Sequence, residues 1–290
     1  MVEVALKRYR QLETIGSGTY GVIYKALDTQ SGELVALKKM IDCSDNEDFI
    51  REVGILKKLN HPNVISLDHI IFRPTYYLIF ELMKMDLKKV LRAGPCPKKI
   101  MRKYLKQLLC GLAHCHQANI YHLDLKPENI LLSKDTLKIA DFGAAHIATL
   151  PACKDTITLG TLWYRSPEIL LGASPFAAST DLWAAGCIFA EMATGKPLFP
   201  GDCDIHQLYT IFQKLGTPTE NTWSGVTKYP HYDKKFPKWP AQKQLIPPSA
   251  VCPNGRDLLQ KMLSYDPTKR ISAQEALLHP YFGTKTKQRS

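Results

Sequence analysis

One short stretch of the chain contains most of the side chains that a phosphoryl transfer would need. Residues 122–129 read HLDLKPEN, and residues 141–143 read DFG. Transfer of a phosphoryl group requires a carboxylate that orients the attacking hydroxyl, a cation near the leaving charge and oxygen ligands for Mg²⁺. Asp124 and Lys126 are candidates for the first two roles, and Asn129 and Asp141 for the metal ligands. The joint pattern has almost no explanation by chance, so it predicts a phosphotransfer site.

A glycine-rich stretch near the N-terminus is suited to holding phosphates. Residues 16–22 read GSGTYGV. Its three glycines, Gly16, Gly18 and Gly21, allow the backbone to come close to phosphate groups. The stretch alone is a weak signal, because a plain glycine-rich hairpin or a dinucleotide-binding turn has the same spacing. It lies between two predicted strands, however, and not between a strand and a helix.

A lysine lies within an apolar strand that follows these glycines. Residues 35–38 read VALK. A lysine in such a position needs a partner for its charge. Glu52, on the next predicted helix, is the natural candidate, and the pair would hold the Lys38 ammonium over nucleotide phosphates. The alternative is a surface lysine on an edge strand, which is how we interpret the neighbouring Lys39.

The elements that position these residues change in character along the chain. The first part is rich in predicted strands and contains one helix, which a capping box formed by Ser44 and Glu47 would begin. The second part is mainly helical. A proline-rich insert at residues 216–253 is expected to be irregular but anchored by its prolines and tryptophans. The predicted strands are 9–15, 22–28, 34–40 and 76–82, and the predicted helices are 44–59, 100–116, 180–194, 205–215, 255–263 and 272–279.

Composition limits the classes of protein to consider. The chain has 290 residues, 45% of them hydrophobic and 22% charged, which is typical of a globular protein. The first ten residues lack the apolar region of a secretory signal, and no apolar run is long enough for a membrane span. Eight cysteines without paired spacing favour reduced thiols and a cytoplasmic or nuclear location. The net charge of +11 favours acidic small ligands or protein partners over specific nucleic acid binding, since no basic run exceeds a few residues.

A group of cysteines and histidines on one predicted helix has two interpretations. Cys110 and His114 would share a helix face, with Cys115 and His116 beside them. Zinc binding would need a second ligand pair with matching spacing, which the sequence does not contain. We therefore expect ordinary packing in the core.

The whole chain, from about residue 9 to 282, resembles a eukaryotic protein kinase. Four further segments resemble the cyclin-dependent kinases, within the larger group that includes the MAP kinases: residues 161–172 (TLWYRSPEILLG), 181–187 (DLWAAGC), 215–218 (LGTP) and 265–273 (YDPTKRISA). The resemblance implies an α+β, bilobal fold. It would comprise an N-terminal lobe at residues 1–82, a hinge at 83–86 and a C-terminal lobe at 87–290 that includes an activation segment at 141–168.

The resemblance also implies an activity and its partners. ATP and Mg²⁺ would serve in the phosphorylation of protein Ser or Thr residues that precede a proline, and Lys126 marks Ser/Thr rather than Tyr kinases. A role in cell-cycle or transcription control and an activating subunit resembling a cyclin would follow. One alternative is a kinase of the same group that needs no cyclin. Another is a pseudokinase scaffold, against which the intact Lys38, Glu52, Asp124, Asn129 and Asp141 argue.

Site residues can be carried over one by one from the resemblance. Lys38 and Glu52 join Asp124, Lys126 and Asn129 as catalytic residues. Glu168 would pair with Arg270, and Asp181 would brace the catalytic loop. Phosphate on Thr19 or Tyr20 would disfavour ATP alignment, whereas Thr156 is the expected activating site, with Thr158 as a nearby alternative. The substrate pocket would comprise Leu159, Gly160, Thr161 and Arg165, and the nucleotide would contact Ile15, Gly16, Gly18, Gly21, Val22, Ala36, Lys38, Phe80, Glu81, Met83, Asp86, Leu131 and Asp141.

The chain departs from the family pattern at three places. Leu123 stands where the family usually has an arginine that receives the activating phosphate, and His146 stands where a second arginine is common. Only Arg51 remains of the usual three. The helix that carries Glu52 lacks the usual cyclin-binding sequence, and Ser166 replaces an alanine, which should be tolerated.

Overall fold

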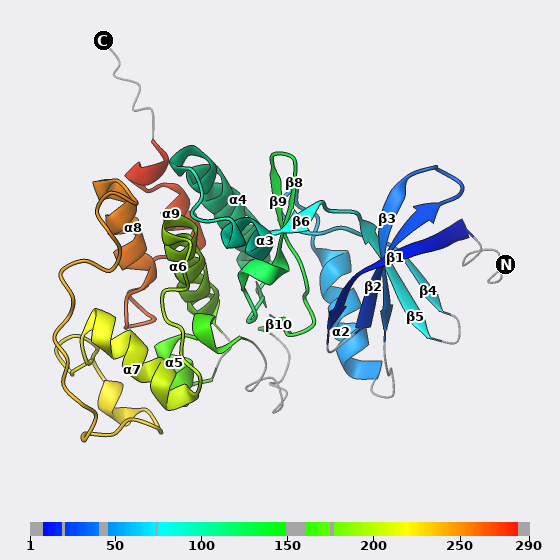
Figure 1. Cartoon of the computed structure of the whole chain (residues 1–290). Coiled ribbons are helices and arrows are strands. Elements are labelled where there is room, and N and C mark those ends of the chain that lie inside the picture. Colours follow the sequence, from blue (N-terminus) through cyan, green and yellow to red (C-terminus); the bar gives the residue numbers. More distant parts are fainter. Residues whose placement is uncertain are drawn as a thin grey trace, which may run out of the picture.

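The computed structural model describes residues 8–18, 21–40, 46–72, 75–148, 161–174 and 177–283. A small lobe built on a β-sheet lies beside a larger, mainly helical lobe (Figure 1). This is the α+β, bilobal arrangement expected from the sequence. Thr19, Tyr20, Thr156, Thr158, Leu159 and Gly160 lie outside the described residues, as does Ser44 of the predicted capping box.

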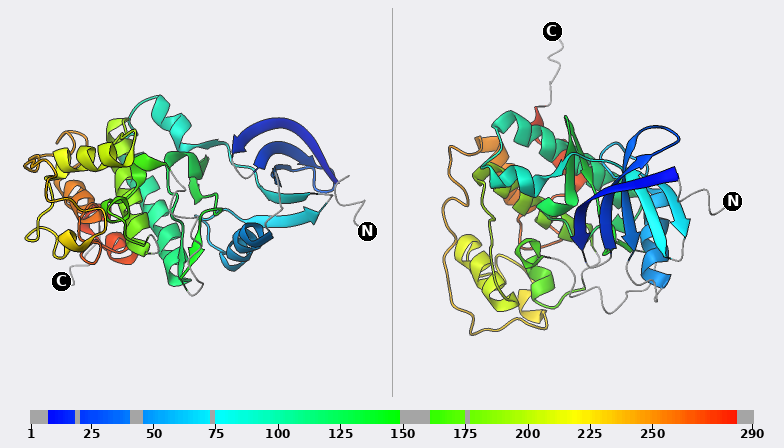
Figure 2. Two further views of the ribbon diagram at one scale, coloured as in Figure 1. Left: turned by 90° about the horizontal axis from the view of Figure 1, so that it is seen from below. Right: turned by 45° about the vertical axis from the view of Figure 1, so that its right-hand side comes forward.

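The sheet of the small lobe contains five antiparallel strands in the order β1-β2-β3-β5-β4. Strand β3 matches its predicted bounds and lies at the centre of the sheet, so Lys38 is not on an edge strand. Helix α2 lies alongside one face of the sheet, as the two views in Figure 2 show. The elements are β1 (Tyr9–Gly18), β2 (Gly21–Asp28), β3 (Leu34–Met40), α2 (Asn46–Lys58), β4 (Leu67–Phe72) and β5 (Tyr76–Glu81).

Short strands form the region where the two lobes meet. One three-stranded sheet has the order β6-β8-β9, and β10 pairs with β7. Residues 122–129, the predicted catalytic stretch, run from β7 to β8, so both ends of this stretch are held by strand pairing. These elements are β6 (Met85–Asp86), β7 (Ile120–Tyr121), η1 (Pro127–Asn129), β8 (Ile130–Ser133), β9 (Thr136–Ile139) and β10 (His146–Ile147).

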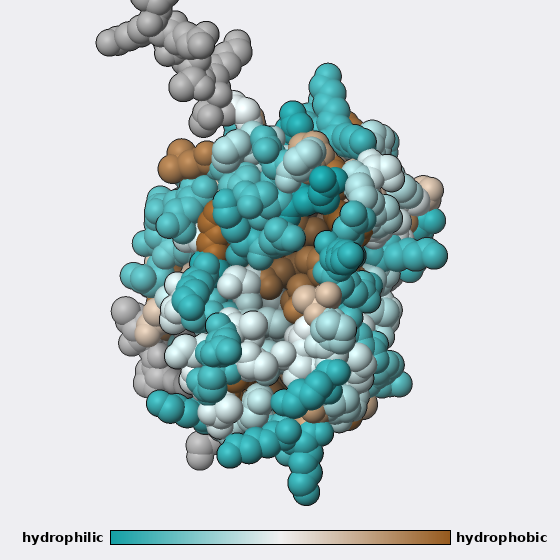
Figure 3. All heavy atoms as spheres, turned by 90° about the vertical axis from the view of Figure 1, so that its left-hand side faces the viewer, coloured by the Kyte–Doolittle hydropathy of each residue, from teal (hydrophilic) through white to brown (hydrophobic). Residues whose placement is uncertain are grey.

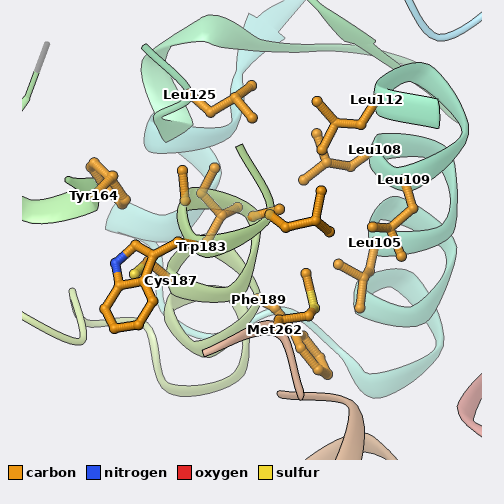
Figure 4. Close-up of a cluster of buried hydrophobic side chains, with 14 of the residues drawn as sticks. Leu105, Leu108, Leu109, Leu112, Leu125, Tyr164, Trp183, Cys187, Phe189 and Met262 are labelled. Carbon is orange, nitrogen blue, oxygen red and sulfur yellow. The ribbon is translucent and has the colours of Figure 1, made fainter. Parts of the chain in front are cut away.

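The large lobe is packed around helix α6, whose residues from Thr180 to Ala193 are all buried. Leucines at helical spacing on α4 point toward α6, and Figure 4 shows Leu105, Leu108 and Leu112 among them. This apolar face holds α4 in place, directly before the catalytic stretch. The elements are α3 (Leu87–Arg92), α4 (Lys98–Gln117), η3 (Leu162–Tyr164), α5 (Pro167–Leu170), α6 (Ala178–Thr194), α7 (Asp204–Leu215), η4 (Val226–Lys228), α8 (Pro253–Met262), α9 (Ala273–Leu277) and η5 (Pro280–Phe282).

The insert at residues 216–253 is irregular and anchored, as its composition predicts. Trp223 is buried and stacks on Tyr265, with ring centroids 5.8 Å apart. Thr217 accepts a hydrogen bond from the backbone N–H of Trp239 (2.9 Å) and donates one to the carbonyl of Pro237 (2.7 Å). These contacts fix the insert without regular backbone pairing.

The outer end of the large lobe is mainly hydrophilic, with hydrophobic surface gathered in a central hollow (Figure 3). Among the helices of the described residues, none combines the length and apolar composition that a membrane span requires.

Candidate active site

The carboxylate of Asp124 lies at the centre of a compact hydrogen-bonded group. Its Oδ2 accepts hydrogen bonds from Lys126 Nζ at 2.6 Å and from Asn129 Nδ2 at 3.2 Å. Its Oδ1 accepts one from the backbone N–H of Thr161 at 3.3 Å. A hydroxyl that approaches this carboxylate meets a positioned acceptor for its proton, with a cation beside it.

The amide of Asn129 is oriented so that its oxygen remains available. Its Nδ2 donates to the backbone carbonyl of Asp124 at 2.9 Å as well as to the Asp124 side chain. Because both of these bonds use the nitrogen, the side-chain oxygen faces away from Asp124. Mg²⁺ prefers hard oxygen ligands, so this amide oxygen and the Asp141 carboxylate are a suitable donor set.

Three separate elements bring a lysine between two carboxylates. Lys38 Nζ, from β3, lies 2.7 Å from Glu52 Oε1 on α2 and 3.8 Å from Asp141 Oδ1. Lys38 and Glu52 are buried, whereas the side chain of Asp141 is 39% exposed. The predicted ion pair is therefore present, and the ammonium also faces the residue expected to bind metal. Asp141 has a φ of 64°, a strained left-handed backbone conformation that aims its side chain.

A buried aspartate on α6 holds the catalytic stretch from below. Asp181 accepts hydrogen bonds from the backbone N–H groups of His122 and Leu123, each at 2.9 Å, and its Oδ2 lies 2.9 Å from His116 Nε2. Burial alone would raise the pKa of Asp181, but the His116 hydrogen bond and the charges of both histidines outweigh it and lower the pKa. The carboxylate therefore stays ionised and fixes the backbone on either side of residue 122.

The residues that replace the usual arginines, Leu123 and His146, lie close to the paired strands β7 and β10. Leu123 has a φ of 64°, and His146 is buried in the short pairing of β10 with β7. Arg51 Nη2 lies 3.5 Å from the carbonyl of Gly143, at the start of the activation segment. Neither the aliphatic Leu123 nor the imidazole of His146 offers the forked set of donors with which an arginine holds a phosphate.

The expected nucleotide contacts come from both lobes and the connection between them. Ala36 on β3 pairs with Phe80 on β5, and Asp86 pairs with Leu131 on β8. Ile15 is 41% exposed on β1, and Met83 is half-buried against the large core. The remaining described members of this set are Gly16, Gly18, Gly21, Val22 and Glu81.

Glycine is suited to positions 18 and 21 for two different physical reasons. A Cβ at Gly21 would lie 2.4 Å from the Lys39 carbonyl, so only glycine allows β2 to approach β3 there. A Cβ at Gly18 would meet no atom of the described residues within 4 Å. This space beside Gly18 is what a backbone that covers phosphates would require.

Some expected site residues are occupied by other contacts. Glu81 Oε1 lies 2.6 Å from Lys138 Nζ, so its carboxylate is engaged in an ion pair, and the expected contact with adenine would use its backbone. Asp86 caps α3 by accepting a hydrogen bond from the backbone N–H of Lys89 at 2.8 Å. Arg165 Nη1 donates to Asp204 Oδ1 at 3.0 Å, whereas Thr161 contacts the catalytic Asp124 directly.

Sequence reasoning missed a charged cluster close to the catalytic stretch. Lys88 Nζ lies 3.6 Å from Glu191 and 3.7 Å from Glu128, and 5.3 Å from the ring centroid of Trp163. Glu191 is buried and accepts a hydrogen bond from Tyr164 Oη at 2.6 Å. Burial raises the pKa of Glu191. The sequence carried no signal for this cluster beyond the place of Glu128 within residues 122–129.

The expected pair of Glu168 and Arg270 is present and bidentate. Arg270 Nη1 and Nη2 donate to the two carboxylate oxygens at 2.7 and 2.8 Å. The same guanidinium also bonds to the carbonyls of Ser264, Ser179 and Tyr265. This pair ties the end of the activation segment to the large lobe.

The cysteines and histidines of α4 are used in packing and hydrogen bonding. Cys115 is buried, His116 contacts Asp181, and the His114 ring stacks on His61 with centroids 5.0 Å apart. Within the described ranges, no group of three or more His, Cys, Asp and Glu side chains is arranged to hold a metal ion.

Comparison with known proteins finds a match that spans almost the whole structure. A family model described as "Protein kinase domain" matches residues 9–282. The matched region begins with β1 and ends with η5, so it includes Asp124, Lys38 and Asp141 together with both lobes.

Proposed function

The chain belongs to the protein kinase family, and on this basis we propose that it phosphorylates Ser or Thr residues of proteins at positions followed by a proline. The single observation that carries the Ser/Thr assignment is the 2.6 Å contact between Lys126 Nζ and Asp124 Oδ2. A lysine two residues after the catalytic aspartate is the feature in which this chain resembles Ser/Thr kinases rather than Tyr kinases.

The geometry supports distinct roles for the residues of the site. Asp124 would accept the proton of the substrate hydroxyl, and Lys126 would stabilise the charge that develops on the transferred group. Lys38, held by Glu52, would position the phosphates of ATP. Mg²⁺ bound by Asn129 and Asp141 would neutralise negative charge on the phosphates.

Preference for proline is proposed from residues 159–165, which belong to the activation segment expected at 141–168. In related kinases, a backbone carbonyl in this region has no hydrogen-bond partner from the substrate. The backbone N–H of the substrate residue after the acceptor therefore gains no hydrogen bond there, and a proline at that position, which lacks the N–H, loses no binding energy. A peptide set with Ser, Thr or Tyr as acceptor, followed by Pro or Ala, tests both assignments. Turnover of the Tyr peptides, or equal turnover of the Pro and Ala peptides, would contradict the proposal.

A cyclin-like activating subunit is supported by apolar surface on the small lobe. Ile50 on α2 is 63% exposed, and Phe72 at the end of β4 is 54% exposed. A protein partner that packs against α2 and the end of β4 would cover these two apolar side chains. Co-purification followed by mass spectrometry would test this by asking whether a cyclin-like protein binds the chain.

A kinase that needs no partner is the second candidate, and one observation favours it. The Lys38–Glu52 ion pair is already formed in the single chain, at 2.7 Å. In a kinase that depends on a partner, formation of this pair is the step that the partner would promote. Basal phosphotransfer by the purified chain distinguishes the two candidates, since a partner-dependent enzyme would show almost none.

We propose a cytoplasmic or nuclear location and a role in cell-cycle or transcription control. The described cysteines Cys96, Cys110, Cys115, Cys187, Cys203 and Cys252 are all free thiols, which supports a reducing compartment. Imaging of the tagged chain in its native cell tests the location.

A further inference from the structure

Most of the net positive charge of the chain comes from one segment. The sequence has 38 Lys and Arg residues against 27 Asp and Glu. Residues 87–123 contain eight of these cations and no Asp or Glu, so the remaining residues contain 30 cations against 27 acids. The charge is therefore a local property of the segment that forms α3 and α4.

Several of these cations share one exposed face of α4. Lys98, Arg102 and Lys106 recur every four residues, which places them in a row along the helix, and Lys99 lies beside them. All four are exposed, while the apolar face of α4 is buried toward α6 (Figure 4). We call Lys98, Lys99, Arg102 and Lys106 the basic face.

The neighbours of the basic face leave its charge largely uncompensated. Arg102 lies over the ring of Tyr281 in η5, 5.1 Å from the centroid. On the other side, Lys103 Nζ pairs with Asp135 Oδ1 at 2.6 Å. Among the residues that the structure describes, none forms an ion pair with a member of the basic face. The face is thus bounded on both sides but open to a ligand.

Helix stability does not explain why these cations are there. Like charges four residues apart on a helix repel each other. Lys98 and Lys99 also occupy the first turn, where acidic residues are favoured, and this turn contains no acidic residue. Among the described residues, this pattern opposes local stability without a compensating ion pair, which points to a function in binding.

We propose that the basic face docks an extended acidic segment of a protein substrate. Residues four apart on a helix are about 6 Å apart along its axis, and alternate residues of an extended peptide are about 6.6 Å apart. A segment with Asp or Glu at every second position therefore matches the row of Lys98, Arg102 and Lys106. Residues 284–290 of this chain contain no Asp or Glu and cannot supply that charge.

A protein segment fits this face better than a nucleic acid does. Binding of single strands relies on exposed aromatic side chains for base stacking. Tyr104, the aromatic residue of α4 nearest in sequence to these cations, is half-buried. The proposal rests on the protein-substrate part of the proposed function, but not on its preference for proline.

Binding of a labelled acidic peptide tests the proposal without any phosphotransfer. The probe has alternating Glu and Ser over roughly ten residues, and fluorescence anisotropy is recorded at about 50 and 200 mM NaCl. One variant carries Lys98→Gln, Lys99→Gln, Arg102→Gln and Lys106→Gln. A matched control carries Lys234→Gln, Lys235→Gln, Lys238→Gln and Lys243→Gln, which removes the same charge from exposed positions of the insert.

We expect the wild type to bind with a Kd below about 1 mM at low salt and more weakly at high salt. The basic-face variant should lose at least about tenfold in affinity, and the insert control less than about threefold. Equal losses in both variants would show an effect of net charge only and overturn the proposal. So would absence of binding by the wild type, or tighter, face-dependent binding of a DNA duplex.

A second arm links the binding to catalysis. One peptide substrate is prepared with an acidic tail and with a neutral tail of equal length. The acidic tail should lower KM by about fivefold or more for the wild type and the insert control, but not for the basic-face variant, with kcat unchanged. An equal effect of the tail on all three proteins would contradict docking at this face. If no peptide is phosphorylated, the proposed function fails, while the binding arm still decides on the docking surface.

Discussion

Lys38 Nζ and Glu52 Oε1 are 2.7 Å apart, and this contact joins the central strand of the small sheet to helix α2. Both residues are buried, so removal of either side chain would leave the charge of the other without a partner and poorly solvated. The position of α2 is therefore coupled to that of the Lys38 ammonium, which we propose holds the phosphates of ATP. Any partner that moves α2 would also move Lys38.

Lys38→Met should reduce kcat by about 10²–10³-fold, because it removes a positioned cation from the phosphates in the transition state. The neighbouring Lys39→Met is the matched control and should remain close to wild type. Steady-state phosphotransfer to a peptide measures both. Equal losses in the two variants, or a fully active Lys38→Met, would show that Lys38 does not have this role.

Arg270→Ala should lower the free energy of unfolding by about 3–5 kcal/mol, since it leaves the buried Glu168 carboxylate without its partner. Urea denaturation of the purified variant gives this value. Lys269→Ala removes an exposed lysine 3.5 Å from Asp266 and should cost less than about 1 kcal/mol. A loss below about 1 kcal/mol at Arg270 would contradict a structural role for the pair.

The stability of the chain should fall as pH decreases through the range where His61 titrates. Burial, with the nearby His114 and Lys138 charges, lowers the pKa of His61 below its ordinary 6.5. Just below pH 6.5, the folded state therefore binds fewer protons at His61 than the unfolded state does. The contribution of His61 to stability is present above pH 6.5 and is lost as the pH falls through the lowered pKa of the folded state. His61→Phe keeps a ring against His114 but cannot titrate.

The measurement is the free energy of unfolding between about pH 7.5 and 5.5 for the wild type and His61→Phe. The variant should have a shallower slope, by a fraction of one proton. If the free energy of unfolding had the same slope against pH in both proteins, His61 would not contribute to the pH dependence.

Thr156→Ala should keep substantial activity once any partner is bound. Charged hydrogen bonds to a phosphate are worth about 1.5–3 kcal/mol each, and Leu123 and His146 have replaced two of the usual arginine donors. Thr156 lies outside the described residues, so the prediction rests on these two positions and on Arg51. A loss of about 100-fold or more, with the partner still bound, would contradict it.

The sequence predicted those helices and strands whose pattern of apolar residues is visible within the segment itself. Strand β3 was found at its bounds, and the leucine spacing of α4 indicated that helix although it begins earlier, at Lys98, where polar residues hide the periodicity. Strand β1 continues beyond Ile15 to Gly18 because Ser17 pairs with Val22 across the hairpin. Helix α9 ends at Leu277, two residues early, since Pro280 begins a separate turn.

Contacts between distant residues could be predicted only where the family pattern pointed to them. The pairs of Lys38 with Glu52 and of Glu168 with Arg270 were expected and are present. The cluster around Lys88 was not expected, because it joins residues 40 to 103 positions apart through the packing of α3 on α6 and the catalytic stretch. No local periodicity carries such information.

Replacement of the Asp124 carboxylate tests the proposed phosphotransfer activity most directly. Transfer of radiolabelled phosphate from ATP to a Ser-Pro peptide is measured for the wild type and for Asp124→Asn, with any activating partner present. We expect transfer by the wild type, and a kcat about 10²–10⁴-fold lower for the variant at an unchanged melting temperature. A rate close to wild type for Asp124→Asn would contradict it.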